Sequence, residues 1–367
     1  MSTTPLPPPE GWRPAHRDAP LLFESFPALR ERVPFIALAH APTPVTRLDA
    51  LSDYLGRDDV WMKRDDLISP LYGGNKVRRF EFVLADALAK GARRVITAGG
   101  FASTQVMATA SFCGALGLEL TAVLFDQPIT RFARQSLLVD VSAGATLVRG
   151  GGYVTTAARV LARRRGAYLI MPGASNALAN IGYVDAMLEL ARQVDEGACP
   201  RPDVIVLPTG SAGTLAALAV GAAHLGWDTE VVGARIATRL VTNGFTVRSR
   251  INATRGFLQH RAPTFSLRRA PRWSLDHGVI GRGYGEPTPE AQENIPRVER
   301  VLGVPGEVTY TGKALAALRA VARDARWRGR TVLWWQTLSS APPRVAPDAM
   351  DRLPNEFRDL FEGGVPC

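Results

Sequence analysis

The stretch VIVLPTGSAGT, residues 204–214, joins a short apolar run to a loop of small residues and then to an alanine-rich apolar segment. The run has the composition of a buried strand, and the segment from Thr214 onward has helical spacing. A loop of this kind directs backbone N–H groups and hydroxyls at a helix amino terminus, where a phosphate dianion is well held. It lacks the GK[ST] of a P-loop and the GxGxxG of a dinucleotide fold, and a plain glycine-rich turn explains this segment alone equally well.

Strand-like and helix-like segments alternate on both sides of this stretch. The predicted buried strands are 60–64, 95–99, 120–125, 168–172, 204–208, 231–236 and 332–336, and the predicted helices include 78–89, 103–115, 183–194 and 214–225. This alternation predicts a doubly wound α/β architecture with ligands at the carboxyl ends of the strands. Residues 1–43, which are proline-rich and irregular, and residues 246–275, which are rich in arginine and weakly periodic, are both expected to be excursions from the core rather than domains.

Length and composition limit the class of protein. A chain of 367 residues, 46% of them apolar, is long enough for two lobes with separate cores. The first 20 residues are rich in proline and lack the apolar core of a secretion signal, so they are expected to form a loose arm. Because no uncharged apolar run reaches membrane-spanning length, we expect a cytoplasmic protein that does not bind membranes.

Cysteine and histidine usage argues against a disulfide framework and against a metal site. The three cysteines are widely spaced and include no CxxC pair, so they are expected to be buried apolar thiols. The five histidines never occur at the i,i+2 or i,i+4 spacing that places two imidazoles on one metal. We therefore expect no metal.

The formal net charge of +10 raises the question of a nucleic-acid partner. Only four of the 44 basic residues are lysines, and most arginines are interspersed with acids, so we expect no nucleic-acid binding. The run from Arg248 to Arg272 contains seven arginines and no acidic residue. It is expected to be a solvated loop face, and an anion-steering rim over a pocket is the alternative.

A lysine follows two glycines in YGGNKVRR, residues 72–79. The glycines let the backbone bend tightly before a helix that is predicted to begin near Lys76. The positive end of the helix dipole disfavours the charged form of an amine there, and so favours the neutral form that Schiff-base formation requires. Alone this motif is a weak signal, because a solvated lysine is the commoner case.

Three further residues could carry chemistry. Ser103 lies in AGGFASTQ, residues 98–105, where it could cap the next helix or present its hydroxyl to a ligand. Tyr284 lies between two glycines, and Tyr310 lies in VTYTGK, residues 308–313. Neither tyrosine is persuasive alone, because tyrosines beside glycines often simply pack with the hydroxyl in water.

Together and in this order, these segments resemble the D-cysteine desulfhydrase and 1-aminocyclopropane-1-carboxylate deaminase family of pyridoxal phosphate enzymes. The resemblance runs from about residue 43 to residue 337. The matching motifs are KRDD (63–66), GGNK (73–76), the GG-x-x-S turn (99–103), PGASNALANIGY (172–183), TGSAGT (209–214), GYG (283–285) and YTGK (310–313).

This resemblance implies fold type II, the tryptophan synthase β-like fold, with two doubly wound open-sheet domains. It implies an amino-terminal arm of residues 1–42, a large cofactor-binding domain of residues 43–78 and 189–367, and a small domain of residues 79–188. A homodimer is implied as well.

The resemblance also implies a function for each matching residue. Lys76 corresponds to the lysine that carries pyridoxal 5'-phosphate and moves the α-proton. Ser103 corresponds to a serine that holds the substrate carboxylate or assists proton transfer, and Tyr284 and Tyr310 match two tyrosines that face the substrate. The remaining implied contacts are to the cofactor from Asn75, Thr104, Thr209, Gly210, Ser211, Ala212, Gly213, Thr214 and Thr311, and to the substrate from Thr104 and Gln105.

Thr311 decides which reaction we expect. It corresponds to the residue beside the pyridine nitrogen, which is a threonine in desulfhydrase-like members and a glutamate in the deaminases. A carboxylate there would keep the nitrogen protonated and make the cofactor a strong electron sink, whereas a hydroxyl cannot hold that proton. We therefore expect α,β-elimination on a small amino acid such as D-cysteine, giving a 2-oxo acid and ammonia.

Several positions depart from the family pattern and leave the substrate open. The family's glutamine-serine-asparagine turn reads Ala102, Ser103, Thr104 here, a position usually held by arginine is Met107, and the late His-Thr-Gly-Gly stretch reads QTLS, residues 336–339. These changes are expected to line the pocket. A sulfonated or dicarboxylic amino acid, bound with help from the arginine-rich run, is one substrate that they allow.

Other functions remain open at this stage. They are 1-aminocyclopropane-1-carboxylate deamination, β-replacement, a divergent pyridoxal phosphate reaction of specialised metabolism, and a catalytically silent cofactor-binding protein. The hypothesis of a nucleic-acid-binding protein rests on net charge alone, and the sequence lacks the alternation of aromatic and basic residues that such proteins use.

Overall fold

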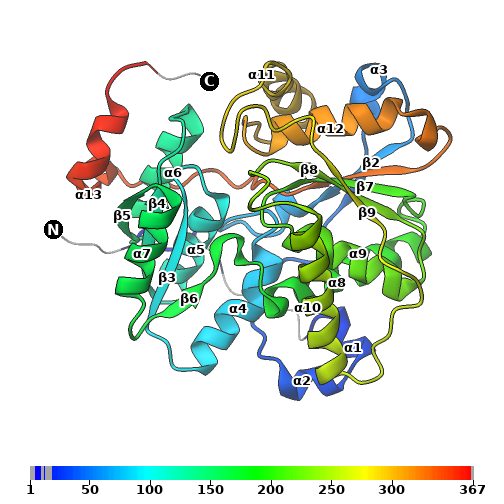
Figure 1. The fold of residues 1–367 in the computed structure, drawn as a ribbon, viewed down its shortest axis with the longest axis horizontal. Helices are drawn as coiled ribbons and strands as arrows, with labels where there is room; N and C mark the ends of the chain where they lie inside the picture. Colours follow the sequence, from blue (N-terminus) through cyan, green and yellow to red (C-terminus); the bar gives the residue numbers. More distant parts are fainter. Residues whose placement is uncertain (1–4, 10–11, 13–18, 365–367) are drawn as a thin grey trace.

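The computed structural model describes residues 5–9, 12 and 19–364, which form two α/β lobes side by side (Figure 1). The larger lobe contains β1 (Val45–Arg47), β2 (Val60–Arg64), β7 (Val204–Thr209), β8 (Glu230–Arg235), β9 (Trp273–Asp276) and β10 (Val332–Gln336). The smaller lobe contains β3 (Arg94–Gly100), β4 (Glu119–Phe125), β5 (Thr146–Gly151) and β6 (Tyr168–Ile170). The sheet orders are β1-β2-β10-β7-β8-β9 and β5-β4-β3-β6.

Parallel pairing dominates both sheets. In the larger sheet only β1, which pairs with β2, is antiparallel, and the four strands of the smaller sheet are all parallel. The seven strands predicted from apolar runs are confirmed. The short strands β1, β5 and β9 were not predicted, because each is only partly buried and carries polar residues.

The central strand β7 shows why helices cover both faces of the larger sheet. Its residues Ile205 and Leu207 enter one apolar core, and Val204 and Val206 enter another on the opposite face. The first core contains α8 (Ala177–Asp195), α9 (Gly213–Leu225) and α10 (Gly244–Arg261), and the second contains α3 (Ser52–Leu55) and α12 (Thr311–Arg323), against which α11 (Pro289–Arg297) packs. A strand buried on both faces must be apolar throughout, as β7 is.

The smaller lobe has its own core. The helices on its sheet are α5 (Thr104–Ala115), α6 (Arg131–Ser142) and α7 (Tyr153–Arg163). The carboxyl-terminal segment, red in Figure 1, returns to this lobe and places α13 (Ala349–Arg352) against α6.

One helix, α4 (Val77–Ala89), belongs to both lobes. Its Phe80 packs in the core of the smaller lobe, and its Phe82 packs in that of the larger lobe. The predicted domain boundary after residue 78 falls at the start of this helix, and the boundary after residue 188 falls inside α8. Both boundaries stay predictions.

The prediction that residues 246–275 form an excursion from the core is wrong. Most of this segment is α10, whose Val247, Ile251 and Leu258 are buried against the larger lobe, and β9 extends the sheet at its edge. The helical signal was weak because only these few apolar positions face the core, while arginines occupy the other faces.

Part of the amino-terminal region is also regular. The short helices α1 (Leu21–Ser25) and α2 (Ala28–Arg32) bury Leu22, Phe23 and Leu29 in the core of the larger lobe. Much of the predicted arm, residues 1–4, 10, 11 and 13–18, lies outside the described residues. In the part of the chain that is described, no helix combines the length and the apolar character needed to cross a membrane.

Candidate active site

A cleft of about 590 Å³ opens between the two lobes. Its walls include the carboxyl ends of β3 and β7, at Gly99, Gly100, Pro208 and Thr209. This is where an open parallel sheet is expected to bind a ligand.

The cleft brings together candidate residues that lie far apart in the chain. Those that line it are Asn75, Lys76, Ser103, Thr104, Gln105, Thr209, Gly210, Ser211, Ala212, Gly213, Thr214, Tyr284 and Tyr310. Thr311 does not line it, but it follows Tyr310 directly and is buried.

Two glycines place Lys76 in the cleft. A Cβ on Gly73 would lie 1.9 Å from the carbonyl oxygen of Asp66. Gly74 has a φ of +84°, and a Cβ there would lie 2.3 Å from the carbonyl oxygen of Thr337. The turn before α4 is therefore pressed against the ends of β2 and β10, and only glycine fits both positions.

The Lys76 side chain is buried and has no acidic partner among the described residues. Its Nζ donates a hydrogen bond to Asn75 Oδ1 at 2.7 Å. Burial, and then the charge of Arg79, hold the pKa of Lys76 well below its usual value. The lowered pKa favours the neutral amine, which is the form that acts as a nucleophile and as a base. The neutral form was predicted from the helix dipole, but burial is the main cause.

The loop after β7 has the geometry of an anion site. Ala212 has a φ of +61°, an unusual conformation for a residue with a side chain, and it provides no side-chain cap for α9. The N–H groups of the first helical turn have no acceptor within the helix, so they are available to an anion. The left-handed backbone costs about 1 kcal/mol or more, and such strain is concentrated at functional sites.

Arg79 is a functional candidate that sequence reasoning missed. Its guanidinium donates to Thr214 Oγ1 at 2.7 Å and to the carbonyl oxygen of Ala174 at 2.7 Å, and no carboxylate pairs with it within the described residues. Burial, and then the nearby charge of Arg250, lower the pKa of Arg79 to about 10, so it stays cationic at neutral pH. The available signal was its position three residues after Lys76, which places both on one helix face.

The residues around this loop fit a ligand that carries a phosphate and an aldehyde. A Cβ on Gly213 would lie 2.7 Å from Asn180 Oδ1 and 2.8 Å from both Nη atoms of Arg79, so the missing side chain leaves this cradle open. Among the described residues, Arg79 Nε and Thr311 Oγ1 are buried without a hydrogen-bond partner. A cation, hydroxyls and free N–H groups match a phosphate, and the neutral Lys76 amine matches an aldehyde.

Two candidates on the turn after β3, Ser103 and Gln105, have different surroundings. Ser103 caps α5, since its Oγ accepts from Val106 N at 3.4 Å, and it also lines the cleft. The Gln105 amide donates to Thr97 Oγ1 at 3.0 Å and to Thr109 Oγ1 at 2.9 Å. Gln105 is therefore anchored to its own lobe, whereas the hydroxyl of Ser103 faces the cleft.

Tyr284 and Tyr310 form a pair in the cleft. Their hydroxyl oxygens lie 2.5 Å apart. Burial raises the pKa of Tyr310 to about 12 and holds that of Tyr284 well above its usual value. Both hydroxyls therefore stay protonated at neutral pH and can donate or relay a proton.

Glu307, also missed, fixes the position of this region. Its carboxylate accepts hydrogen bonds from the backbone N–H groups of Thr309, Tyr310 and Thr311 at 2.5, 2.6 and 2.7 Å. Burial raises its pKa in spite of these bonds. Glu307 does not line the cleft, so it acts as the amino-terminal cap of α12.

A buried ionic network supports the lysine turn from behind. Lys63 Nζ lies 2.5 Å from Glu189 Oε1, and Arg78 lies 2.8 Å from Asp65 and 2.9 Å from Glu189. Burial alone would raise the pKa of Glu189, but Arg78 and Lys63 together hold it well below its usual value. The network joins β2, α4 and α8 of the larger lobe.

Some predicted pocket positions lie elsewhere. Ala102 is fully buried and does not line the cleft, and Met107 lines a separate cavity of about 80 Å³ beside Tyr72. The expectation that these two changes line the pocket is wrong, while Thr337 and Leu338 do line it. None of the seven arginines from Arg248 to Arg272 lines the cleft. The described residues include no group of three or more potential metal ligands.

Comparison with known proteins adds a family and a fold. A family model described as pyridoxal-phosphate dependent enzyme matches residues 36–335. A crystal structure described as an ACC deaminase homologue is 27% identical, covers 87% of this chain and 95% of its own, and has a TM-score of 0.69. A threonine deaminase from T.th. is 19% identical, with coverages of 89% and 98% and a TM-score of 0.56. A hydrogen sulfide-producing enzyme from Fusobacterium nucleatum is 12% identical, with coverages of 82% and 96% and a TM-score of 0.55. The lobes described above thus have fold type II.

Proposed function

This chain belongs to the family of pyridoxal-phosphate dependent enzymes, and we propose that it catalyses α,β-elimination on a small amino acid such as D-cysteine. One amino acid and one water give a 2-oxo acid, ammonia and the protonated leaving group. From D-cysteine the products are pyruvate, ammonia and hydrogen sulfide.

The cleft has a place for each part of the cofactor. The loop 209–214 and Arg79 would hold the phosphate, Lys76 would bind the aldehyde carbon, and Thr311 would lie beside the ring nitrogen. When bound, pyridoxal phosphate withdraws electrons from the α-carbon of the amino acid and so makes its α-proton removable.

The other roles in the reaction can be assigned to individual side chains in the cleft. Lys76, whose lowered pKa favours the neutral amine, is held by Asn75 and can take the proton from the α-carbon. Ser103, at the amino terminus of α5, can hold the substrate carboxylate. Tyr284 and Tyr310 keep their protons and can give one to the departing group.

The presence of a threonine at position 311 is the observation that favours elimination over ring opening. Its hydroxyl cannot hold a proton on a ring nitrogen as a carboxylate would. The buried carboxylate of Glu307 does not replace it, because both of its oxygens already accept backbone hydrogen bonds from Thr309, Tyr310 and Thr311.

A second candidate is 1-aminocyclopropane-1-carboxylate deamination. It is supported by the 27% identity to the structure described as an ACC deaminase homologue and by the tyrosine pair. Thr311 argues against it, since ring opening needs the stronger electron sink.

Product analysis separates the two candidates. Purified, cofactor-loaded protein is assayed with D-cysteine, L-cysteine and 1-aminocyclopropane-1-carboxylate, and sulfide, pyruvate and 2-oxobutyrate are measured. We expect sulfide and pyruvate in equal amounts and little 2-oxobutyrate. Release of 2-oxobutyrate as the main activity would overturn elimination, and a cofactor absorbance that no amino acid changes would indicate a silent binding protein.

Two variants test the argument from Thr311. Thr311→Glu is expected to raise the ratio of 2-oxobutyrate to pyruvate by about tenfold or more, because the added carboxylate strengthens the electron sink. Thr311→Val has nearly the same shape and removes only the hydroxyl, so it serves as the folding control and is expected to keep the wild-type ratio. An unchanged ratio in a folded Thr311→Glu protein would contradict the assignment.

A further inference from the structure

Many of the residues in the walls of the cleft are apolar. Phe125, Val160, Leu169 and Met171 line it together with Lys76 and the phosphate loop, residues 209–214. Of the described residues that line the cleft, none is acidic, and the basic ones are Lys76 and Arg164. A small polar amino acid such as cysteine would leave these walls without a contact.

Helix α7 contributes an apolar stripe to the cleft. Tyr153, Ala157, Val160 and Leu161 line it and are spaced at i, i+4, i+7 and i+8, which places them on one helix face. Tyr153 is 54% exposed and Leu161 is 59% exposed. An amphipathic helix normally buries such a stripe, but α7 leaves it open toward the cleft.

An aromatic chain joins this stripe to the reacting centre. The ring of Phe125 lies 4.6 Å from that of Tyr153 and 6.0 Å from that of Tyr284, centroid to centroid. Tyr284 in turn is hydrogen-bonded to Tyr310. The apolar wall therefore begins beside the tyrosine pair and continues along α7, where Thr156 and Arg164 also line the cleft.

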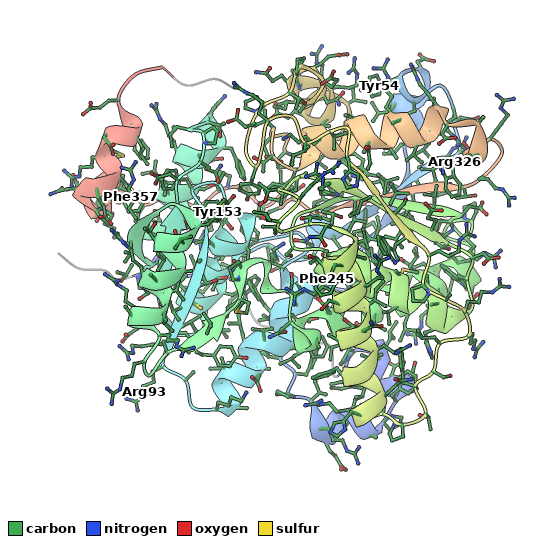
Figure 2. The ribbon with its side chains drawn as sticks, viewed as in Figure 1. Tyr54, Arg93, Tyr153, Phe245, Arg326 and Phe357 are labelled. Atoms are coloured by element: carbon green, nitrogen blue, oxygen red, sulfur yellow. The ribbon has the colours of Figure 1, made fainter. Side chains whose placement is uncertain are left out.

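The larger lobe has a second apolar surface at the edge of the cleft. Val241 lines the cleft, and nearby Leu240 and Phe245 are 94% and 78% exposed. The neighbouring Thr242 donates a hydrogen bond to the carbonyl oxygen of Gly210, which ties this segment to the phosphate loop. Figure 2 shows Tyr153 on the smaller lobe and Phe245 at the start of α10 on the larger lobe.

We propose that the substrate carries an extended apolar β-substituent, as in a cysteine whose sulfur is joined to an alkyl or aryl group, and that this substituent lies along α7. The proposal rests on the proposed function and narrows its substrate class. The Cα–H bond breaks with the proton passing to Lys76, the Cβ–S bond breaks with its electron pair passing to sulfur, and the thiolate takes up a proton. With one water, the products are the thiol, pyruvate and ammonia.

A series of substrates of increasing length tests this. Cofactor-loaded wild type is titrated with S-methyl-, S-butyl- and S-hexylcysteine, in both enantiomers, and Kd is measured from the change in cofactor absorbance. Pyruvate release is measured in parallel. Each buried methylene adds up to about fourfold in affinity, so we expect Kd to fall at least about tenfold from methyl to hexyl.

Two variants on α7 form a matched pair. Leu161→Glu places a charge on the stripe and is expected to remove most of the gain in affinity with chain length. Val154→Glu adds the same charge on the same helix at a residue that is 84% exposed and does not line the cleft, and it should keep the gain. Size-exclusion chromatography of both variants monitors the oligomeric state.

Each result has one meaning. A Kd that is flat or rises with chain length overturns the apolar substituent and leaves the proposed function intact, provided that small amino acids still change the spectrum. If Leu161→Glu gains as much affinity with increasing chain length as wild type does, the apolar stripe does not bind the substrate. The same conclusion follows if Leu161→Glu changes only the oligomeric state. If no amino acid of any length changes the spectrum, the proposed function itself is wrong.

Discussion

Arg79 Nη2 donates a hydrogen bond to Thr214 Oγ1 at 2.7 Å, although the two residues are 135 positions apart in the chain. The same guanidinium bonds the carbonyl oxygen of Ala174 and the hydroxyl of Ser175, on the connection between β6 and α8. Since Arg79 lies one turn after Lys76, these bonds set the separation between the reactive amine and the phosphate loop. An active site that holds reacting groups at a fixed separation lowers the barrier to their reaction, and this accounts for a large part of the rate acceleration.

Replacing Arg79 should weaken cofactor binding more than it weakens folding. Arg79→Met would remove the charge-assisted contact that we propose to the phosphate, worth roughly 1.5–3 kcal/mol, so the Kd for pyridoxal phosphate should rise about 10- to 150-fold. Arg79→Lys keeps the charge but loses the planar set of guanidinium donors, so its Kd for pyridoxal phosphate should lie between those of wild type and Arg79→Met. Equilibrium dialysis of apoprotein measures these values, and an unchanged Kd in Arg79→Met would place the phosphate elsewhere.

Lys76 should be required for the covalent attachment of the cofactor. We expect purified wild type to be yellow and Lys76→Ala to lack the wild-type absorbance band and to be inactive, because no other lysine lines the cleft within the described residues. Lys90→Ala is the matched control, since Lys90 is exposed just after the same helix, where it pairs with Asp86 and lies over the ring of Tyr168. A Lys76→Ala protein that keeps the wild-type band would show that another amine holds the cofactor.

Sequence reasoning succeeded where a local pattern and a chemical requirement coincide. The apolar strands β7 and β10 could be predicted because both of their faces are buried. Lys76 and the loop after β7 could be proposed because small residues mark both turns. In contrast, α10 was missed because its three buried apolar positions are spread among arginines and other polar residues.

Residues whose importance depends on distant contacts could not be found in this way. Arg79 is one of forty arginines, and only its contacts across the fold distinguish it. Glu307 likewise acts through backbone groups that only the folded turn brings together. The cytoplasmic location and the homodimer, implied by composition and by the family resemblance, stay predictions.

Breaking the buried ionic network should destabilise the larger lobe. Glu189→Gln leaves Lys63 and Arg78 short of a negative charge in a buried site, which should lower the free energy of unfolding by about 3–5 kcal/mol in urea denaturation. Glu24→Gln is the control, because its pair with Arg192 is half-exposed and should be worth less than about 1 kcal/mol. Equal losses in the two variants would contradict a structural role for the network.

The same network predicts a pH dependence. The pKa of Glu189 is lower in the folded protein than its ordinary value of 4.5. Its stabilising contribution is therefore complete above that ordinary value and is lost as the pH falls through the folded pKa. Acid should destabilise wild type more steeply than Glu189→Gln, and parallel stability curves for the two proteins would exclude this explanation.

The tyrosine pair should act as one unit. If Tyr310 donates a proton that Tyr284 relays, then Tyr310→Phe and Tyr284→Phe should each lower kcat by about a hundredfold with little change in KM, and the double variant should lose hardly more than either single variant. Because burial holds the pKa of Tyr310 at about 12 and that of Tyr284 well above its usual value, kcat should not decline at mildly alkaline pH through these hydroxyls. Tyr168→Phe also loses one hydrogen bond, to Asp86, but lies outside the cleft and should leave kcat unchanged. If the fold loss in kcat of the double variant equals the product of the two single losses, the two hydroxyls act in separate steps.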